Sequence, residues 1–256
     1  MNKIAGAFEN KKALITFITG GDPDIETTEK LILAMAESGS DIIEIGIPFS
    51  DPVAEGIVIQ DANKRALDNG CTVDKLFDMV AGLRTQVNIP LLFMTYANPV
   101  YVYGKEKFMS KCKETGIDGI IVPDVPFEEK DEFEDVCRQY GISMISLIAP
   151  TSGERTEKIA KEAEGFLYCV SSLGVTGTRS EINTNIAELI SGVKKVSSVP
   201  CAVGFGISTP EQAKNMAAIS DGVIVGSAIV KLIAEFGKDS IEPVKSMVRE
   251  FKNSML

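Results

Sequence analysis

Residues 41–47 read DIIEIGI, an almost unbroken apolar run that carries one glutamate, Glu44. A strand with one face in water alternates apolar and polar residues, whereas a strand buried on both faces is apolar throughout, as in parallel sheets. The run therefore predicts a buried parallel strand. Its two faces differ because side chains alternate along a strand: Ile42, Glu44 and Gly46 on one face, Ile43, Ile45 and Ile47 on the other.

The same kind of run recurs along the chain, followed each time by an amphipathic stretch. The predicted strands are 13–19, 41–47, 90–96, 119–125, 142–150, 166–172, 199–205 and 221–227. The predicted helices are 24–39, 72–84, 104–116, 127–141, 152–165, 184–196, 209–220 and 241–255. Eight strand–helix units in about 250 residues are typical of a (β/α)8 TIM barrel. We predict one such domain over residues 1–256, with an extra N-terminal helix; a doubly wound sheet is the alternative.

Composition excludes several classes of protein. The net charge is −10 and no basic stripe is present, which argues against nucleic acid as a partner. No uncharged apolar run reaches 18 residues, so we expect no membrane span, and the N-terminus lacks the pattern of a signal peptide. Five cysteines without a CxxC motif suit a reducing cytoplasm. Histidine is absent and no acidic–thiol cluster has metal spacing, so we expect no metal, and an enzyme would move protons with other side chains.

Three glycine-rich segments follow the last three predicted strands. They read GVTGTR (174–179), GFGIS (204–208) and VGSA (225–228). Glycine lets backbone N–H groups approach an anion closely, and Gly226-Ser227 can open a short helix whose N-terminus favours negative charge. Barrel enzymes often bind phosphate at these loops. Plain turns are the alternative. Because the three segments follow three consecutive strands, they favour a phosphate site that is held mainly by backbone amides.

The face assignment of the 41–47 strand points Glu44 into the barrel, near the C-terminal end where barrel enzymes place their chemistry. Burial raises the pKa of a carboxyl group, which then both gives and takes a proton near neutrality. A structural glutamate bound to a neighbouring donor is the alternative. The loop that follows adds Asp51 and Glu55, which simple turns also explain. Phe17, Tyr96 and Tyr168 lie in or at the ends of strands and either line the site or pack in the core.

Taken together, these segments resemble the tryptophan synthase alpha subunit family over essentially the whole chain. The motifs that carry the resemblance are EIGIPFSDPVAEG (44–56), TYANP (95–99), PDVP (123–126), SLGVTGTR (172–179), GFGIS (204–208) and VGSAIV (225–230). The resemblance implies a carbon–carbon lyase that cleaves indole-3-glycerol phosphate to indole and glyceraldehyde 3-phosphate in tryptophan biosynthesis. It implies no cofactor in this chain and a pyridoxal-phosphate beta subunit as partner in a two-alpha, two-beta assembly, to which indole passes through a tunnel.

The resemblance also implies roles for single residues. Glu44 takes the position of the catalytic glutamate, and Glu55 that of the second catalytic carboxylate, which accepts a hydrogen bond from the indole N–H. Asp51 lies where the family's loop meets the beta subunit. The implied indole pocket is formed by Phe17, Tyr96, Ile121 and Tyr168, and the implied phosphate site and its closing loop by Thr176, Gly177, Gly206, Gly226 and Ser227.

Two residues depart from the family's pattern, D-P-x-A-D-G-P. Glu55 stands where the family has aspartate, and Ile57 where it has proline. The longer side chain moves the carboxylate by one methylene, and a misplacement of about 1 Å can cost on the order of a hundredfold in rate. This departure is the reason for one alternative to a competent lyase, an impaired subunit that mainly binds and activates the beta chain. A separate alternative is another phosphate-binding barrel enzyme, such as an isomerase or epimerase, which the absence of histidine and of metal spacing disfavours. Asp61, nearby, is a further candidate for the indole contact.

Overall fold

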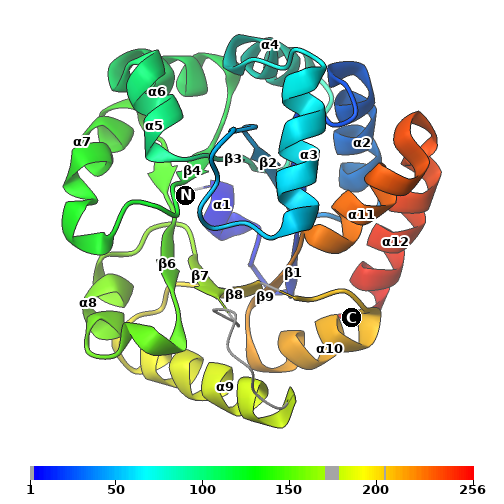
Figure 1. The fold of residues 1–256 in the computed structure, drawn as a ribbon. Helices are drawn as coiled ribbons and strands as arrows, with labels where there is room; N and C mark the ends of the chain where they lie inside the picture. The colour runs from blue at the N-terminus through cyan, green and yellow to red at the C-terminus, as the bar shows by residue number, and fades with distance from the viewer. Residues whose placement is uncertain (1–2, 171–178, 205) are drawn as a thin grey trace.

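In the computed structural model, which describes residues 3–170, 179–204 and 206–256, parallel strands surround a central axis and helices form an outer ring (Figure 1). Each strand pairs in parallel with its neighbours, in the order β5-β4-β3-β2-β1-β9-β8-β7-β6. The strands are β1 (Ala13–Thr19), β2 (Ile42–Gly46), β3 (Leu91–Met94), β4 (Gly119–Ile121), β5 (Ser143–Met144), β6 (Ser146–Ile148), β7 (Leu167–Val170), β8 (Cys201–Gly204) and β9 (Gly222–Val225).

The two edges of this sheet, β5 and β6, are parts of the single strand predicted over residues 142–150. Only Ile145 separates them, and its N–H donates to the carbonyl of Ile120 over 2.9 Å. The fifth strand therefore bends so that its first half pairs with β4 and its second half with β7. This nearly closes the barrel, which confirms the predicted (β/α)8 fold; the doubly wound alternative is wrong.

The helices alternate with the strands as predicted, with additions at both ends of the barrel. They are α1 (Lys3–Gly6), α2 (Ile25–Glu37), α3 (Ile57–Asp68), α4 (Val73–Leu83), α5 (Ala97–Tyr103), α6 (Lys105–Thr115), α7 (Asp131–Tyr140), α8 (Arg155–Glu162), α9 (Arg179–Val196), α10 (Pro210–Ile219), α11 (Ser227–Phe236) and α12 (Ile241–Ser254). Short 3-10 turns are η1 (Phe127–Glu129), η2 (Pro150–Ser152) and η3 (Gly237–Asp239). None of the helices within the described residues is long and apolar enough to cross a lipid bilayer.

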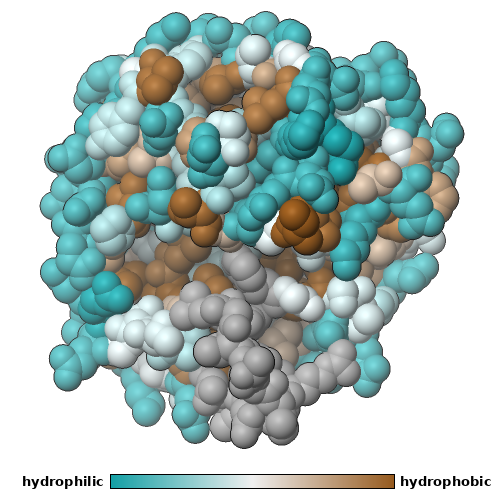
Figure 2. Space-filling view, in the orientation of Figure 1, coloured by the Kyte–Doolittle hydropathy of each residue, from teal (hydrophilic) through white to brown (hydrophobic). Residues whose placement is uncertain are grey.

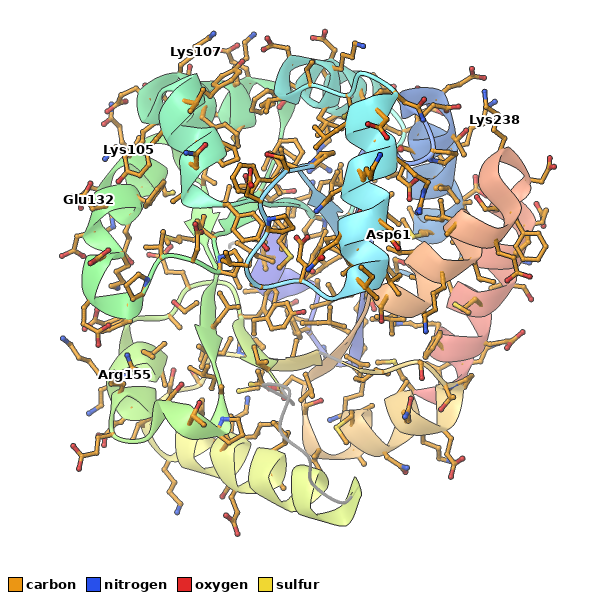
Figure 3. The ribbon with its side chains drawn as sticks, in the orientation of Figure 1. Asp61, Lys105, Lys107, Glu132, Arg155 and Lys238 are labelled. Atoms are coloured by element: carbon orange, nitrogen blue, oxygen red, sulfur yellow. The ribbon has the colours of Figure 1, made fainter. Side chains whose placement is uncertain are left out.

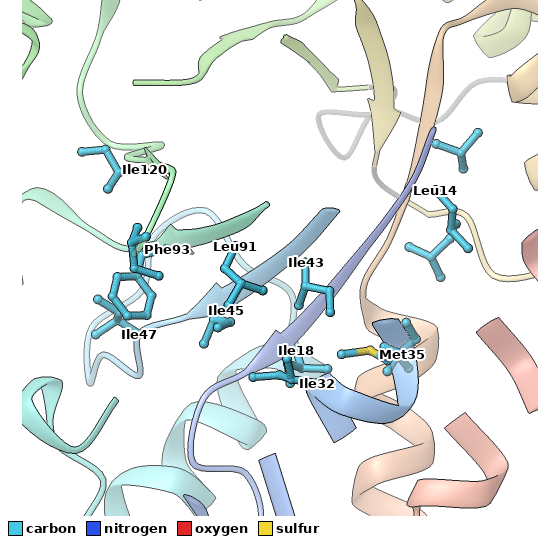
Figure 4. Close-up of a cluster of buried hydrophobic side chains, with 14 of the residues drawn as sticks. Leu14, Ile18, Ile32, Met35, Ile43, Ile45, Ile47, Leu91, Phe93 and Ile120 are labelled. Atoms are coloured by element: carbon cyan, nitrogen blue, oxygen red, sulfur yellow. The ribbon is translucent and has the colours of Figure 1, made fainter. Parts of the chain in front are cut away.

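The strand faces divide the core as the alternation in residues 41–47 predicts. Outward-facing side chains such as Ile43 and Ile45 pack with Ile32 and Met35 of α2, between the sheet and the helices (Figure 4). Inward-facing side chains, Ile42 among them, form a second cluster inside the barrel. The predicted N-terminal helix, α1, adds fully buried Ile4 to this inner cluster. It thereby closes the N-terminal end of the barrel and leaves the other end for a cavity.

Candidate active site

A cavity of about 310 Å³ opens at the C-terminal end of the barrel. In Figure 2 hydrophobic side chains, in brown, gather in the hollow at the centre of this face. Strands contribute Phe17, Glu44, Met94, Tyr168 and Ile224 to its wall. The loop after β2 and the start of α3 contribute residues 54–59, and the segments after β8 and β9 contribute Gly206, Ile207, Gly226, Ser227 and Lys231.

Glu44 is the most unusual side chain in this wall. It is 0% exposed, and among the described residues neither of its carboxylate oxygens has a hydrogen-bond partner. Burial without compensation raises the pKa of Glu44 to about 8. A structural glutamate would be expected to bind a neighbouring donor. Because this one binds none among the residues that the structure describes, it is available to exchange a proton with a molecule in the cavity near neutral pH.

Two aromatic rings flank Glu44, and two glycines make room for them. Phe17 lies opposite Glu44 in the β1–β2 register, and a β carbon on Gly46 would lie only 2.7 Å from Phe17 Cζ. Tyr168 is buried on β7, and a β carbon on Gly204 would lie 2.6 Å from its hydroxyl oxygen. Burial, together with the nearby charge of Glu44, raises the pKa of Tyr168 well above its usual value. The cavity therefore offers flat apolar walls beside the carboxyl group.

Glu55 reaches the cavity from the loop after β2, and several bonds hold this loop. Its Oε2 accepts a 2.7 Å hydrogen bond from Asn63 Nδ2, and its backbone carbonyl accepts one of 2.7 Å from Gln60 Nε2. The neighbouring Ala54 N–H donates to the Tyr96 hydroxyl over 3.1 Å. Burial raises the pKa of Glu55, and the hydrogen bonds from Asn63 and Tyr96 oppose that shift. A second carboxyl group thus lines the same cavity in a fixed loop.

The part of the cavity wall formed by the start of α11 suits an anion. Gly226 is the N-cap of α11 and Ser227 its first residue, and the N–H groups of a helix's first turn have no partner within the helix. Lys231 follows one turn later and also lines the cavity. The motifs GFGIS and VGSA contain no lysine or arginine, so a search restricted to them misses Lys231. Its spacing of four residues from Ser227, which places both on one helix face, is the signal that could have found it.

The structure brings together most of the predicted site residues, but not all. Those in the cavity wall are Phe17, Glu44, Glu55, Tyr168, Gly206, Gly226 and Ser227. Tyr96 is buried behind the loop after β2, which its hydroxyl supports, and Ile121 packs inside the barrel, so neither belongs to the wall. Asp51 is exposed on the loop. Thr176 and Gly177 lie outside the described residues.

Several charged side chains around the barrel lie outside the cavity wall. Asp61 is exposed on α3 and is not part of the cavity wall (Figure 3), which removes it as a substitute for Glu55. Lys105 and Lys107 lie at the outer rim of the barrel, as Figure 3 shows, and Lys105 pairs with Glu132 at 3.2 Å. Among the described residues of the cavity wall, Lys231 is the one positively charged side chain.

Known proteins share both this sequence and this fold. The family model for the tryptophan synthase alpha chain matches residues 5–255. The tryptophan synthase alpha chain of Lacticaseibacillus casei is 46% identical over 252 residues, 98% of this chain and 95% of that protein. That of Halalkalibacterium halodurans is 49% identical over 96% of this chain and 93% of its own length.

Solved structures agree with the sequence matches. The crystal structure of the alpha subunit from Legionella pneumophila has a TM-score of 0.91 and 37% identity, covering 100% of this chain and 98% of its own. The tryptophan synthase complex from Pyrococcus furiosus contains a chain with a TM-score of 0.85 and 37% identity, covering 94% and 98%. An isomerase or epimerase of another barrel family is therefore excluded. The chain belongs to the tryptophan synthase alpha chain family.

Proposed function

We propose that the cavity at the C-terminal end of the barrel is where this chain carries out the reaction of its family, the cleavage of indole-3-glycerol phosphate to indole and glyceraldehyde 3-phosphate. One observation carries the assignment of the site. Glu44 is fully buried, has no partner among the described residues and lines a cavity whose wall also includes aromatic side chains and the N-terminus of α11. The indole ring would lie against Phe17 and Tyr168, with the phosphate at the other end.

In this proposal Glu44 acts as both acid and base. Because its pKa is raised to about 8, the carboxyl group is mostly protonated at pH 7 and can donate its proton to the ring carbon that bears the glycerol chain. The resulting carboxylate then takes the proton of the adjacent chain hydroxyl as the carbon–carbon bond breaks. The bond electrons restore the aromatic ring, the hydroxyl carbon becomes the aldehyde, and Glu44 regains its proton.

Glu55 and the start of α11 hold the two ends of the substrate. The Glu55 carboxylate accepts a hydrogen bond from the ring N–H, which becomes more acidic as the ring gains positive charge. The phosphate accepts hydrogen bonds from backbone N–H groups around Gly206, Gly226 and Ser227, with Lys231 adding a positive charge. This geometry needs no cofactor in the chain, and pyridoxal phosphate would belong to the beta partner.

We further propose that the face around the cavity mouth binds the beta chain in a two-alpha, two-beta assembly. The loop that carries Asp51 also exposes Val53 and Ile57, at 78% and 67%. On α5, Tyr101 and Val102 are exposed at 48% and 80%. Exposed apolar side chains gathered on one face are typical of an interface. Covering the mouth would let indole leave toward the partner rather than into water.

The impaired-subunit alternative depends on Glu55 being misplaced. Its hydrogen bond to Asn63 and its place in the cavity wall support a competent second carboxylate. The alternative predicts that Glu55→Asp restores turnover, whereas our proposal predicts no gain from that change. Indole release by the wild-type chain and by Glu55→Asp, each saturated with the beta chain, separates the two.

The reaction assignment is tested by indole release from indole-3-glycerol phosphate by wild type and Glu44→Gln. Because removal of a general acid–base group typically costs 10²- to 10⁴-fold, we expect a loss of about a thousandfold in kcat. Glu157→Gln, on the outer helix α8, is the matched control and should keep full activity, since Glu157 is exposed and pairs with exposed Lys161. A Glu44→Gln variant that stays within tenfold of wild type contradicts the assignment.

A further inference from the structure

The side chain that holds Glu55 in the cavity comes from α3, a helix that the substrate-binding motifs do not include. Asn63 is 3% exposed, and its Nδ2 lies 2.7 Å from Glu55 Oε2. We propose that Asn63 is a positioning residue, which fixes the Glu55 carboxylate as a hydrogen-bond acceptor for the substrate's ring N–H. The proposal rests on the proposed function, because it explains how that function is achieved with a glutamate at this position.

A glutamate on a surface loop needs such an anchor. Its carboxylate is separated from the backbone by two methylenes, whose rotation must stop before the group can accept a bond in one direction. The loop backbone is already held by Gln60 on one side and, through Ala54, by Tyr96 on the other. Asn63 fixes the remaining freedom of the side chain. A carboxylate has about four acceptor positions, so one bond from Asn63 leaves capacity for the ring N–H.

The length of Glu55 matches the position of Asn63. Shortening the side chain by one carbon–carbon bond withdraws the carboxylate by about 1.5 Å. Added to the present 2.7 Å, this takes the acceptor beyond hydrogen-bonding range of Asn63 Nδ2 unless the loop moves. A buried amide donor would then be left without this acceptor, which is unfavourable. Glu55 and Asn63 therefore form a matched pair. Changing either residue should remove most of the other residue's contribution to kcat/KM.

The pair also has a consequence for pH. The groups that face Glu55 are Asn63 of α3 and Tyr96 between β3 and α5, while Glu44 of β2 and Lys231 of α11 line the same cavity. The bond from Asn63 lowers the pKa of Glu55, so its removal raises that pKa. If ionised Glu55 binds the ring N–H, activity falls as the pH drops through this pKa. Loss of Asn63 must therefore move the acidic limb of the rate profile to higher pH.

A double-mutant cycle on the full chain, saturated with the beta chain, tests the pairing. We expect Asn63→Ala and Glu55→Asp each to lower kcat/KM for indole-3-glycerol phosphate about tenfold or more. In the double variant the second change should cost less than threefold. We also expect Asn63→Ala to shift the acidic limb to higher pH, which a merely structural role would not do.

Matched variants guard against trivial explanations. Asn69→Ala removes an amide at the end of the same helix, where Asn69 donates to the Pro23 carbonyl, and it should leave the rate profile unchanged. Thermal unfolding shows whether Asn63→Ala is folded. If it is not, the isosteric Asn63→Asp takes its place. This variant replaces the amide donor by a carboxyl group that repels Glu55, and it should shift the acidic limb still further to higher pH. Independent, multiplicative losses with an unmoved acidic limb would overturn the pairing. A wild-type chain that releases no indole at all would instead overturn the proposed function.

Discussion

At the scale of single residues, the proposed reaction depends on a carboxyl group that is buried without a hydrogen-bond partner among the described residues. Glu44 is 0% exposed beside Phe17 and Tyr168, and its pKa of about 8 reflects the cost of burying its charge. Its place on an apolar strand indicates burial from sequence, because the face assignment follows from alternation alone. The absence of a described partner does not follow, because it depends on which neighbours surround the strand in three dimensions.

This burial predicts a stability that depends on pH. Between the unfolded pKa of about 4.5 and the folded pKa of about 8, the folded chain keeps the Glu44 proton and the unfolded chain loses it. The contribution of this group to stability is therefore complete below pH 4.5 and is lost as the pH rises toward 8. As the pH rises from 4.5 to 9, we expect the free energy of unfolding of Glu44→Gln to increase relative to that of wild type by on the order of 4–5 kcal/mol. Urea unfolding at both pH values measures this gain, and an equal difference at both would contradict the assigned pKa.

At the scale of the elements, regular units are predictable and their modifications are not. β1 spans Ala13–Thr19, as its apolar run predicts. In contrast, α3 begins with Ile57, Val58 and Ile59, β-branched residues that are typical of strands, so its sequence gives no helix signal at the start. The break at Ile145 is likewise hidden, because both halves of the fifth strand are equally apolar. The missing helix signal at the start of α3 matters for function, because this helix carries Asn63 and its first residues line the cavity.

The helix α11 permits a test of the anion end. Its first turn and Lys231 line the cavity, so replacing the lysine by methionine removes a charge but keeps the apolar stem. We expect Lys231→Met to raise KM for indole-3-glycerol phosphate about tenfold with little change in kcat, because phosphate binding is shared by the substrate and the transition state. Lys238→Met is the control, since Lys238 lies in η3, at the rim in Figure 3, and pairs with Asp24. Steady-state kinetics that show equal KM values for both variants would remove Lys231 from the site.

At the scale of the whole molecule, the barrel separates stability from chemistry. α1 closes the N-terminal end with fully buried Ile4, while the cavity and both carboxyl groups lie at the opposite end. We expect Ile4→Ala to lower the free energy of unfolding by about 2–5 kcal/mol, the usual cost of such a cavity, and to leave KM unchanged. Chemical denaturation measures the free energy of unfolding, and steady-state kinetics on the same sample measures KM. A large change in KM would show that the two ends are coupled.

The most direct test of the central claim is the pH profile of kcat/KM for indole release, measured for wild type and Glu44→Gln with the beta chain present. If Glu44 donates the proton to the ring, the wild-type value must fall as the pH rises through about 8, where this acid loses its proton. In Glu44→Gln the remaining activity should be about a thousandfold lower and lack this alkaline limb. An alkaline limb that persists unchanged in Glu44→Gln would assign the proton to another group and contradict the account.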